Sequence, residues 1–274
     1  MGKPASLWTV WCDNVATVSP LLIAVDLAQL VAYLDAYLRI AALPDDPRAL
    51  NGLQVANSGT VTRTGAAVDL CEATVRLAAD QRVTLMLVHH GLFWGGSQPL
   101  TGPSYRRVAG LIRHDVALYS AHLPLDLHPE VGNNAMLARQ LGIAPRGAFG
   151  EEYGVPIGMW GELDVSRAAL EQQLAALLGA RPRVLGFGPE RVRRVGVVTG
   201  GAGGLIGQAA RAGLDTFITG EGAHHTFAEA EELGVNVFYA GHYATETVGV
   251  KALAAHLEAK FGVPWTFLDH PTGL

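Results

Sequence analysis

Short, almost entirely apolar runs alternate with helical segments along much of this sequence. Between residues 65 and 120 the pattern predicts, in order, the strand Gly65–Leu70, the helix Glu72–Gln81, the strand Val83–Val88, the helix Arg106–Arg113 and the strand Val116–Ser120. Apolar runs of this length, bounded by turn residues, are typical of strands that are buried on both faces of a parallel sheet. The alternation therefore predicts an α/β fold with mainly parallel sheets, covered by helices on both faces.

The same periodicity predicts further elements on either side of this region. The additional helices are Ile23–Leu38, Gly132–Leu141, Arg167–Leu178, Leu205–Ala212, Thr226–Leu233 and Val248–Lys260. The additional strands are Leu53–Val55, Arg183–Phe187, Val195–Thr199, Thr216–Thr219, Val235–Tyr239 and Trp265–Leu268. Ser166 is a typical N-cap and Gly179 a typical C-terminal stop for the helix between them.

Chain length and a change in texture predict two α/β units. The chain has 274 residues, about two domains at roughly 100–200 residues each. The glycine-rich segment Gly147–Gly161 is interpreted as a linker or strand entry into a second unit. The first 20 residues match neither unit, and we expect them to form a poorly ordered N-terminal extension. Residues 21–130 with 238–274 are expected to form one α/β domain, and residues 131–237 a second.

Composition excludes several classes of protein. Hydrophobic residues make up 49% of the chain and charged residues only 16%, which excludes a disordered tail. Two cysteines are too few for a disulfide scaffold. The net charge is −5 and no basic block is present, so nucleic acid is not expected as the main partner. No apolar stretch reaches the roughly 20 residues of a membrane span, and the N-terminus lacks a signal-type apolar region. We expect a cytoplasmic protein.

Metal-ligand types of side chain follow three of the predicted strands. They are His89 and His90 after Val83–Val88, His122 and Asp126 after Val116–Ser120, and His242 and Glu246 after Val235–Tyr239. In open parallel sheets, ligands bind outside the carboxyl ends of the strands. If these three strands share a sheet, the side chains converge on one crevice.

The convergence of imidazoles and carboxylates favours a site for divalent metals. His89 and His90 are adjacent and point in opposite directions on an extended backbone, so they would serve two neighbouring ions. Asp126 or Glu246 would bridge such a pair, which activates water at neutral pH. Each element also has a plainer interpretation. The histidine pair is compatible with a structural role, Asp126 with a turn or cap, Glu246 with a solvated first turn of a helix, and His122 with a core histidine that orients its neighbours.

Two further strand ends carry weaker signals. Gly200–Gly204 follows Val195–Thr199 and precedes a helix, so Gly201, Gly203 and Gly204 would cradle a phosphate or simply form a tight turn. Glu221 and His225 follow Thr216–Thr219 and are candidates for an acid, a base or a supporting residue, with a solvent-exposed turn as the alternative. No Gly-x-Ser-x-Gly elbow is present, which disfavours a serine nucleophile.

Six sequence blocks resemble the signatures of one family. They are Asn51-Gly52-Leu53-Gln54-Val55, Val88-His89-His90-Gly91-Leu92-Phe93-Trp94, Ala121-His122-Leu123-Pro124-Leu125-Asp126, Gly132-Asn133-Asn134, Phe217-Ile218-Thr219-Gly220-Glu221 and Gly241-His242-Tyr243-Ala244-Thr245-Glu246. In this order they are similar to the dinuclear-metal-centre family of GTP cyclohydrolase I type 2 homologues, also called Nif-three-like. The likeness spans from about Leu21 to the C-terminus, without the inserted domain of longer members.

The resemblance implies two α/β domains and a toroidal homohexamer with metal sites facing its interior. It implies two divalent ions at the carboxyl ends of strands, between the two domains, with residues 21–130 and 238–274 as the metal-binding domain. Histidine and carboxylate ligands suit zinc, manganese, iron and nickel alike, which leaves the metal open. The implied ligands are His89, His90, Asp126, His242 and Glu246. His122 and His225 match family histidines for which the resemblance implies a supporting or proton-transfer role.

The family name implies opening of the guanine ring of GTP with loss of formate. Metal-activated water attacking C8 would suit that chemistry, with His225 or Glu221 moving a proton and the Gly200–Gly204 loop holding phosphate. A broader hydrolase hypothesis allows another small nucleotide or a phosphoester as the substrate. Because no clear substrate-recognition motif is present, the alternative is a protein that is not an enzyme. It would store or deliver metal, or form a regulatory ring that binds a partner.

Overall fold

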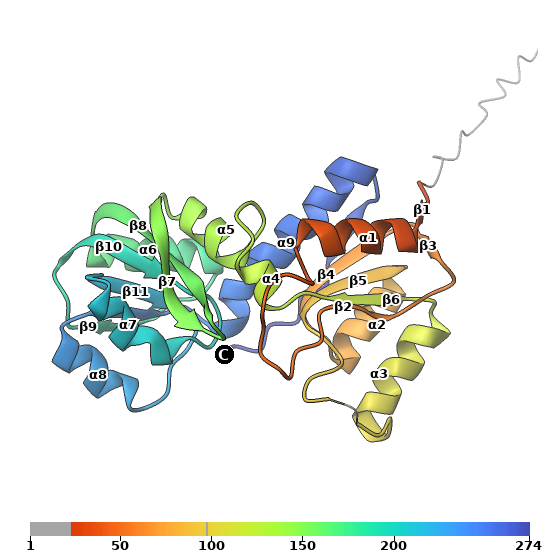
Figure 1. Cartoon of the computed structure of the whole chain (residues 1–274), viewed down its shortest axis with the longest axis horizontal. Helices are drawn as coiled ribbons and strands as arrows, with labels where there is room; N and C mark the ends of the chain where they lie inside the picture. The colour runs from red at the N-terminus through yellow and green to blue at the C-terminus, as the bar shows by residue number, and fades with distance from the viewer. Residues whose placement is uncertain (1–22, 97) are drawn as a thin grey trace, which may run out of the picture.

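The computed structural model describes residues 23–96 and 98–274, so the predicted extension at residues 1–20 lies outside the described residues. The chain forms an α/β fold with two large sheets, each covered by helices, which occupy the two halves of Figure 1. A two-stranded sheet of β1 (Val25–Asp26) and β3 (Thr60–Val61) lies beside the first half. No helix in the described part of the chain is long and apolar enough to cross a membrane.

The first large sheet has the strand order β13-β4-β5-β6-β2. Its strands are β2 (Gly52–Val55), β4 (Thr64–Asp69), β5 (Leu85–His90), β6 (Ala117–Ser120) and β13 (Trp265–Phe267). Strands β13, β4, β5 and β6 run parallel, and β2 joins the edge antiparallel to β6. The parallel strands predicted from the apolar runs are therefore confirmed in this sheet.

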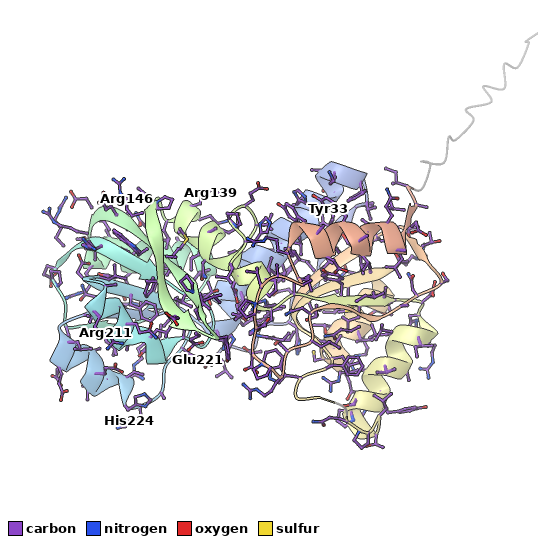
Figure 2. The ribbon with its side chains drawn as sticks, in the orientation of Figure 1. Tyr33, Arg139, Arg146, Arg211, Glu221 and His224 are labelled. Atoms are coloured by element: carbon purple, nitrogen blue, oxygen red, sulfur yellow. The ribbon has the colours of Figure 1, made fainter. Side chains whose placement is uncertain are left out.

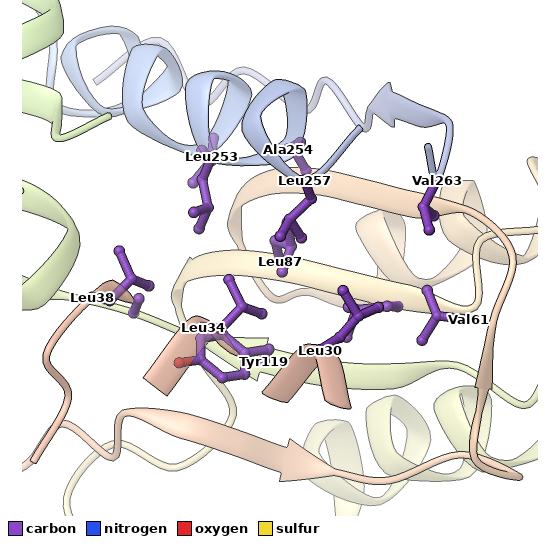
Figure 3. Packing of buried hydrophobic residues seen from close by; sticks show 14 of the residues in the cluster. Leu30, Leu34, Leu38, Val61, Leu87, Tyr119, Leu253, Ala254, Leu257 and Val263 are labelled. Carbon is purple, nitrogen blue, oxygen red and sulfur yellow. The ribbon is translucent and has the colours of Figure 1, made fainter. Parts of the chain in front are cut away.

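Alternate side chains of the central strands enter two separate layers of core. Leu85 and Leu87 of β5 pack under α1 (Leu27–Tyr37) and α9 (His242–Phe261), whereas Met86 and Val88 pack under α2 (Glu72–Asp80) and α3 (Gly102–Arg113). Figure 3 shows the first layer, in which leucines of α1 and α9 meet across the strand. Burial of each such leucine contributes about 1.5–3 kcal/mol, which fixes β5 and the two histidines at its end.

The second large sheet has the order β7-β8-β10-β11-β12-β9. Its strands are β7 (Ala144–Glu152), β8 (Val155–Ser166), β9 (Arg183–Gly186), β10 (Arg191–Val197), β11 (Thr216–Thr219) and β12 (Asn236–Tyr239). Only β10, β11 and β12 are mutually parallel, and the remaining pairs are antiparallel. The core on one face includes residues of α5 (Asn133–Gln140) and α6 (Arg167–Leu178). On the other face it includes residues of the 3₁₀ turn η1 (Gly203–Leu205), α7 (Ile206–Arg211) and α8 (Thr226–Leu233).

The segment interpreted as a linker or a strand entry is a β-hairpin, so the linker alternative was wrong, whereas the entry of strands into a second unit is confirmed. Strands β7 and β8 are joined by the two-residue turn Tyr153-Gly154, in which both φ angles are positive (51° and 79°). This is the turn geometry that matches the twist of a hairpin. Gly154 serves the turn, whereas Gly147, Gly158 and Gly161 serve close packing. A Cβ on Gly161 would collide with the carbonyl of Ala144 on the paired strand.

The predicted helix Arg167–Leu178 is confirmed together with both of its caps. The Ser166 hydroxyl accepts from the Ala169 amide at 3.1 Å, and Gly179 adopts a left-handed conformation with φ 78°. In contrast, α9 begins at His242, six residues before the predicted start at Val248. The turn before it needs φ 93° at Gly241, and the β-branched residues of the first turns weaken the sequence signal for helix.

The chain enters the second sheet at β7 and leaves it after β12. The predicted boundary at residue 237 therefore falls inside β12, which ends at Tyr239. Helix α9 follows at once and packs its buried leucines in the core of the first sheet. It consequently links the carboxyl end of an inner strand of the second sheet to the core of the first sheet (Figure 1).

Candidate metal centre

The five predicted metal ligands lie together at the carboxyl ends of strands from both sheets. His89 and His90 end β5, Asp126 ends the one-turn helix α4 (Leu123–Asp126) after β6, and His242 and Glu246 lie in the first turns of α9 after β12. All of them except His89 line a cavity of about 210 Å³, and His89 lies behind its wall. The structure thus brings together all the residues to which the sequence assigned the metal.

His89 is completely buried, yet one of its ring nitrogens has no hydrogen-bond partner among the described residues. Its Nδ1 donates to the carbonyl oxygen of Ala121 at 2.9 Å, which leaves the lone pair on Nε2. That Nε2 lies 3.5 Å from Asp126 Oδ2 and 3.5 Å from Glu246 Oε1. Burial lowers the pKa of His89, but the two carboxylates outweigh it and raise the pKa to about 10. The position therefore favours a positive charge, either a proton or a cation.

Three further histidines are each oriented by a carboxylate. The pairs are His90 Nδ1 with Asp69 Oδ1 at 2.8 Å, His122 Nδ1 with Asp45 Oδ1 at 2.7 Å, and His242 Nδ1 with Glu221 Oε1 at 2.8 Å. Since a carboxylate can only accept, Nδ1 carries the proton in each pair. Nε2 is thereby the nitrogen that offers its lone pair to a metal when the ring is neutral, and this is the arrangement that metal-ligating histidines usually show in proteins.

Glu246 is the carboxylate that connects the two halves of the cluster. Its Oε1 lies 3.1 Å from His242 Nε2, and its Oε2 lies 3.6 Å from His90 Nε2. Burial opposes ionisation, but the charge of His89 and the hydrogen bond from His242 hold the pKa of Glu246 well below its usual range. The same carboxylate, against the opposing effect of burial, raises the pKa of His242 to about 9. Glu246 is therefore a carboxylate placed between two sets of nitrogen ligands, as a bridge would be.

The Asp126 side chain is held by residues outside its own helix, one from α5 and one from the loop after β10. Its Oδ1 accepts from Asn133 Nδ2 at 2.8 Å and from the Thr199 hydroxyl at 3.2 Å. Its Oδ2 is left facing His89. Asn134 in turn accepts from the amide of Thr199 at 2.8 Å. The block Gly132-Asn133-Asn134 noted in the sequence thus positions a ligand-type carboxylate.

The donor set fits divalent metal ions. His89, His90 and His122 offer ligand atoms that lie within 4.8 Å of one another, and so do His90, His242 and Glu246. Two buried atoms, Nε2 of His89 and Oε2 of Glu246, have no hydrogen-bond partner in the described part of the chain, which is costly unless a ligand meets them. Imidazole and carboxylate together suit zinc, manganese, iron and nickel. The geometry adds His122, expected as a supporting residue, to the candidate ligands.

The glycine loop after β10 approaches the cluster more closely than any side chain would permit. Gly200 has φ 72°, and a Cβ there would collide with Glu246 Oε1 and lie 3.2 Å from His242 Nε2. The amide of Gly203 already donates to the Glu221 carbonyl at 3.1 Å, so it is not available to a phosphate. Of the three glycines predicted to hold phosphate, only Gly201 lines the cavity. Close approach to the ligands explains Gly200, and a phosphate role stays a prediction for Gly201 and Gly204.

The two proton-transfer candidates occupy different places. Glu221 holds His242, and Figure 2 shows it at the junction of the two halves of the molecule. His225 is exposed at the start of α8 and does not line the cavity, and the neighbouring His224 lies at the outer edge in Figure 2. Sequence reasoning missed Asp45 and Asp69, the orienting partners of His122 and His90. Asp69 carries the one available sequence signal, an acidic residue at a strand end, whereas Asp45 lies in the loop between α1 and β2.

Comparison with known proteins places this arrangement among relatives. The family described as Duf34/NIF3 (NGG1p interacting factor 3) matches residues 25–272. A protein of Deinococcus radiodurans named GTP cyclohydrolase 1 type 2 homolog is 47% identical over 248 residues, covering 90% of this chain and 94% of that protein. A Pyrococcus horikoshii protein of the same name is 43% identical, covering 91% of this chain and 100% of that protein. The crystal structure of TTHA1606 from Thermus thermophilus is 48% identical with a TM-score of 0.84, covering 91% of this chain and all of that one.

Proposed function

The chain belongs to the Duf34/NIF3 family, and from this premise we propose that it is a dinuclear metal-dependent hydrolase. In its sharpest form the proposal is a GTP cyclohydrolase-like reaction, in which both bonds to C8 of the guanine ring are hydrolysed and C8 leaves as formate. A small nucleotide or phosphoester is the broader substrate class. The observation that carries the proposal is a pair of buried atoms, His89 Nε2 and Glu246 Oε2, that have no hydrogen-bond partner among the described residues. His89 Nε2 lies 3.5 Å from Glu246 Oε1, and Glu246 Oε2 lies 3.6 Å from His90 Nε2.

Two divalent ions, when bound, would activate water at neutral pH and polarise the bond under attack. His89, His90, Asp126, His242 and Glu246 would hold them, with His122 beside them. The chain's other residues set the geometry of this group. Asp69 and Glu221 keep the Nδ1 protons of His90 and His242 in place, so that both Nε2 lone pairs face the cavity. Asn133 and Thr199 keep Asp126 turned toward His89.

The cavity supports a small ring as the reacting group. Its volume of about 210 Å³ suits a bicyclic base but not a whole nucleotide, so phosphates of a nucleotide would extend toward solvent. Apolar and aromatic side chains of Leu123, Ile157, Val198 and Trp94 line it beside the candidate ligands. The rest of the lining is polar and includes several ionisable side chains, so the apolar surface is the part that a flat ring would contact.

The test is formate release from GTP by the chain loaded with each metal in turn. We expect formate in proportion to bound metal, and we expect Glu246→Gln to lose both metal and turnover. Glu258→Gln is the matched control, because Glu258 lies exposed on the same helix, far from the cavity lining. Full metal occupancy without formate would refute the cyclohydrolase form. A panel of phosphoesters would then test the broader hydrolase: turnover of any of them would support it, and no turnover would refute it for that class of substrate.

The alternative is storage or delivery of metal without catalysis. Metal transfer to an apo-acceptor protein, without turnover of any substrate tried, would support it.

We further propose that the chain assembles as a homohexameric ring with its metal centres facing inward. Light scattering coupled to size-exclusion chromatography tests the ring directly, and a monomeric or dimeric mass would refute it.

A further inference from the structure

The tip of the β7–β8 hairpin forms one wall of the metal cavity. Glu152 ends β7, Tyr153 is in the turn, and both line the cavity that holds the candidate metal ligands. The hairpin belongs to the second sheet, whereas His90 and His122 on the opposite wall come from the first. The cavity is thus closed by a segment that contributes no candidate ligand.

The hairpin tip is anchored across the cavity. The Tyr153 hydroxyl donates to Asp46 Oδ2 at 3.0 Å, and Asp46 is buried in the loop before β2. The Nε of Arg48 donates to the other carboxylate oxygen of Asp46 at 2.9 Å and neutralises its charge. The guanidinium of Arg48 also lies over the Trp94 ring, with Cζ 5.8 Å from its centroid. These contacts hold the backbone of Glu152 at a fixed place on the rim.

Glu152 is a solvent-exposed carboxylate at the rim of this wall that no described side chain binds. Within residues 23–96 and 98–274, its side chain makes no hydrogen bond and no ion pair, in contrast to Asp46 beside it. Its partial desolvation by the cavity wall raises the pKa of Glu152, and the charge of Asp46 raises it further. A ligand that donates hydrogen bonds would relieve both effects. Trp94 and Tyr153 supply aromatic surface to the same space, which favours a flat ligand.

We propose that Glu152 is the specificity-determining residue of this cavity and accepts hydrogen bonds from a planar heterocycle. The matching ligand edge has a ring N–H next to an exocyclic amine, as guanine has, because two adjacent donors meet the two oxygens of one carboxylate. The other end of the heterocycle then faces His90, His242 and Glu246. The choice of guanine among such rings rests on the proposed function.

Charge on the rim strengthens the discrimination. Asp46 is paired with Arg48, so Glu152 carries the unpaired negative charge on this wall. A ring whose edge presents an acceptor nitrogen would place a lone pair against that charge and would be repelled. A ring that lacks the exocyclic amine would leave one carboxylate oxygen without a donor. Selection therefore operates both by attraction and by exclusion.

The experiment compares guanosine with inosine, which lacks only the exocyclic amine, by isothermal titration calorimetry on the full metal-loaded chain. We expect guanosine to bind about tenfold more tightly or better, a typical effect of one hydrogen bond to a charged group. Glu152→Gln should reduce the ratio to below about threefold. Glu151→Gln is the matched control, because neighbouring strand residues point to opposite faces and Glu151 does not line the cavity. Metal content and thermal unfolding verify that both variants are folded and loaded.

Three results would overturn the inference: no binding of either nucleoside at millimolar concentration, equal affinity for the two, or an unchanged ratio in Glu152→Gln. These outcomes are separate from the test of the proposed function. Formate release from GTP without a role for Glu152 would leave the hydrolase in place and remove the specificity residue. Selective guanosine binding through Glu152 without formate release would retain Glu152 as the specificity residue and refute the cyclohydrolase reaction.

Discussion

Replacing Gly200 by alanine should weaken metal binding strongly while lowering the stability of the fold only slightly. Gly200 combines a φ of 72° with contact to the cluster, since an added Cβ would collide with Glu246 Oε1. The colliding atom is the end of a side chain, so the carboxylate rather than the backbone would move. The cost should therefore fall mainly on metal binding.

The magnitude follows from two separate terms. The left-handed backbone costs an alanine roughly 1–2 kcal/mol of unfolding free energy. The carboxylate must shift on the order of 1 Å to restore ordinary contact, whereas metal–ligand distances tolerate only about 0.2 Å. Misplacing one ligand group should cost about 10–100-fold in metal affinity. We therefore expect a small loss of stability and a large loss of affinity.

Two glycines of the same chain supply matched controls. Gly142 has the same φ of 72° with no atom within 4 Å of its added Cβ, so Gly142→Ala measures backbone strain alone. Gly204 lies in the same loop as Gly200, with open space and no positive φ, so Gly204→Ala should change neither property. Metal affinity is measured by competition with a chromophoric chelator, and stability by urea unfolding of the metal-free proteins. Wild-type affinity in Gly200→Ala would refute the reasoning and the assignment of Glu246 as a ligand.

Three other outcomes follow from the site and its surroundings. Glu221→Gln should weaken metal binding about 10–100-fold by loosening His242, whereas His225→Ala should leave it unchanged; equal effects in a metal titration would contradict the geometry. Because the pKa values of the metal-free His89 and His242 are raised to about 10 and 9, metal binding at pH 7 should expel protons, and affinity should rise with pH until about pH 9–10. Calorimetry in buffers of different ionisation enthalpy measures the released protons, and buffer-independent heats would contradict this. Burial lowers the pKa of His128 below its usual value of 6.5, so the folded state disfavours its charged form and stability should fall as pH drops below about 6.5. The urea midpoint should fall less between pH 7.5 and 5.5 in His128→Asn than in the wild type, and an equal fall would exclude His128 as the cause.

Local rules were sufficient for much of the fold and for the ligand set. Helix α6 was predicted to the residue because its N-cap and C-terminal glycine follow from backbone chemistry within a few residues. His89, His90 and His242 were found because each follows the carboxyl end of a parallel strand, where ligands usually bind. The shared sheet assumed for them was wrong, since β5 and β12 belong to different sheets whose strand ends face one site.

Long-range contacts explain what sequence reasoning missed. Asp45 contacts His122 across 77 residues, and nothing local marks it as a partner. Gly200 was interpreted as part of a phosphate loop because its close approach to Glu246 exists only once the two sheets are in place. Glu152 was missed because its glycine-rich segment resembles a linker. The sequence alone does not distinguish glycines that permit tight packing from glycines that permit flexibility.

The connection of α9 has a consequence for how this protein folds during synthesis. All strands of the second sheet lie between Ala144 and Tyr239, so that sheet can close while the C-terminal part of the chain is still in the ribosome. The first sheet cannot be completed until β13 is synthesised, because β13 pairs with β4 roughly 200 residues earlier. Its core also requires the leucines of α9. The unit synthesised first is thus completed last. The metal centre, which needs His89 from one unit and His242 from the start of α9, cannot assemble before the second sheet and the start of α9 have been synthesised.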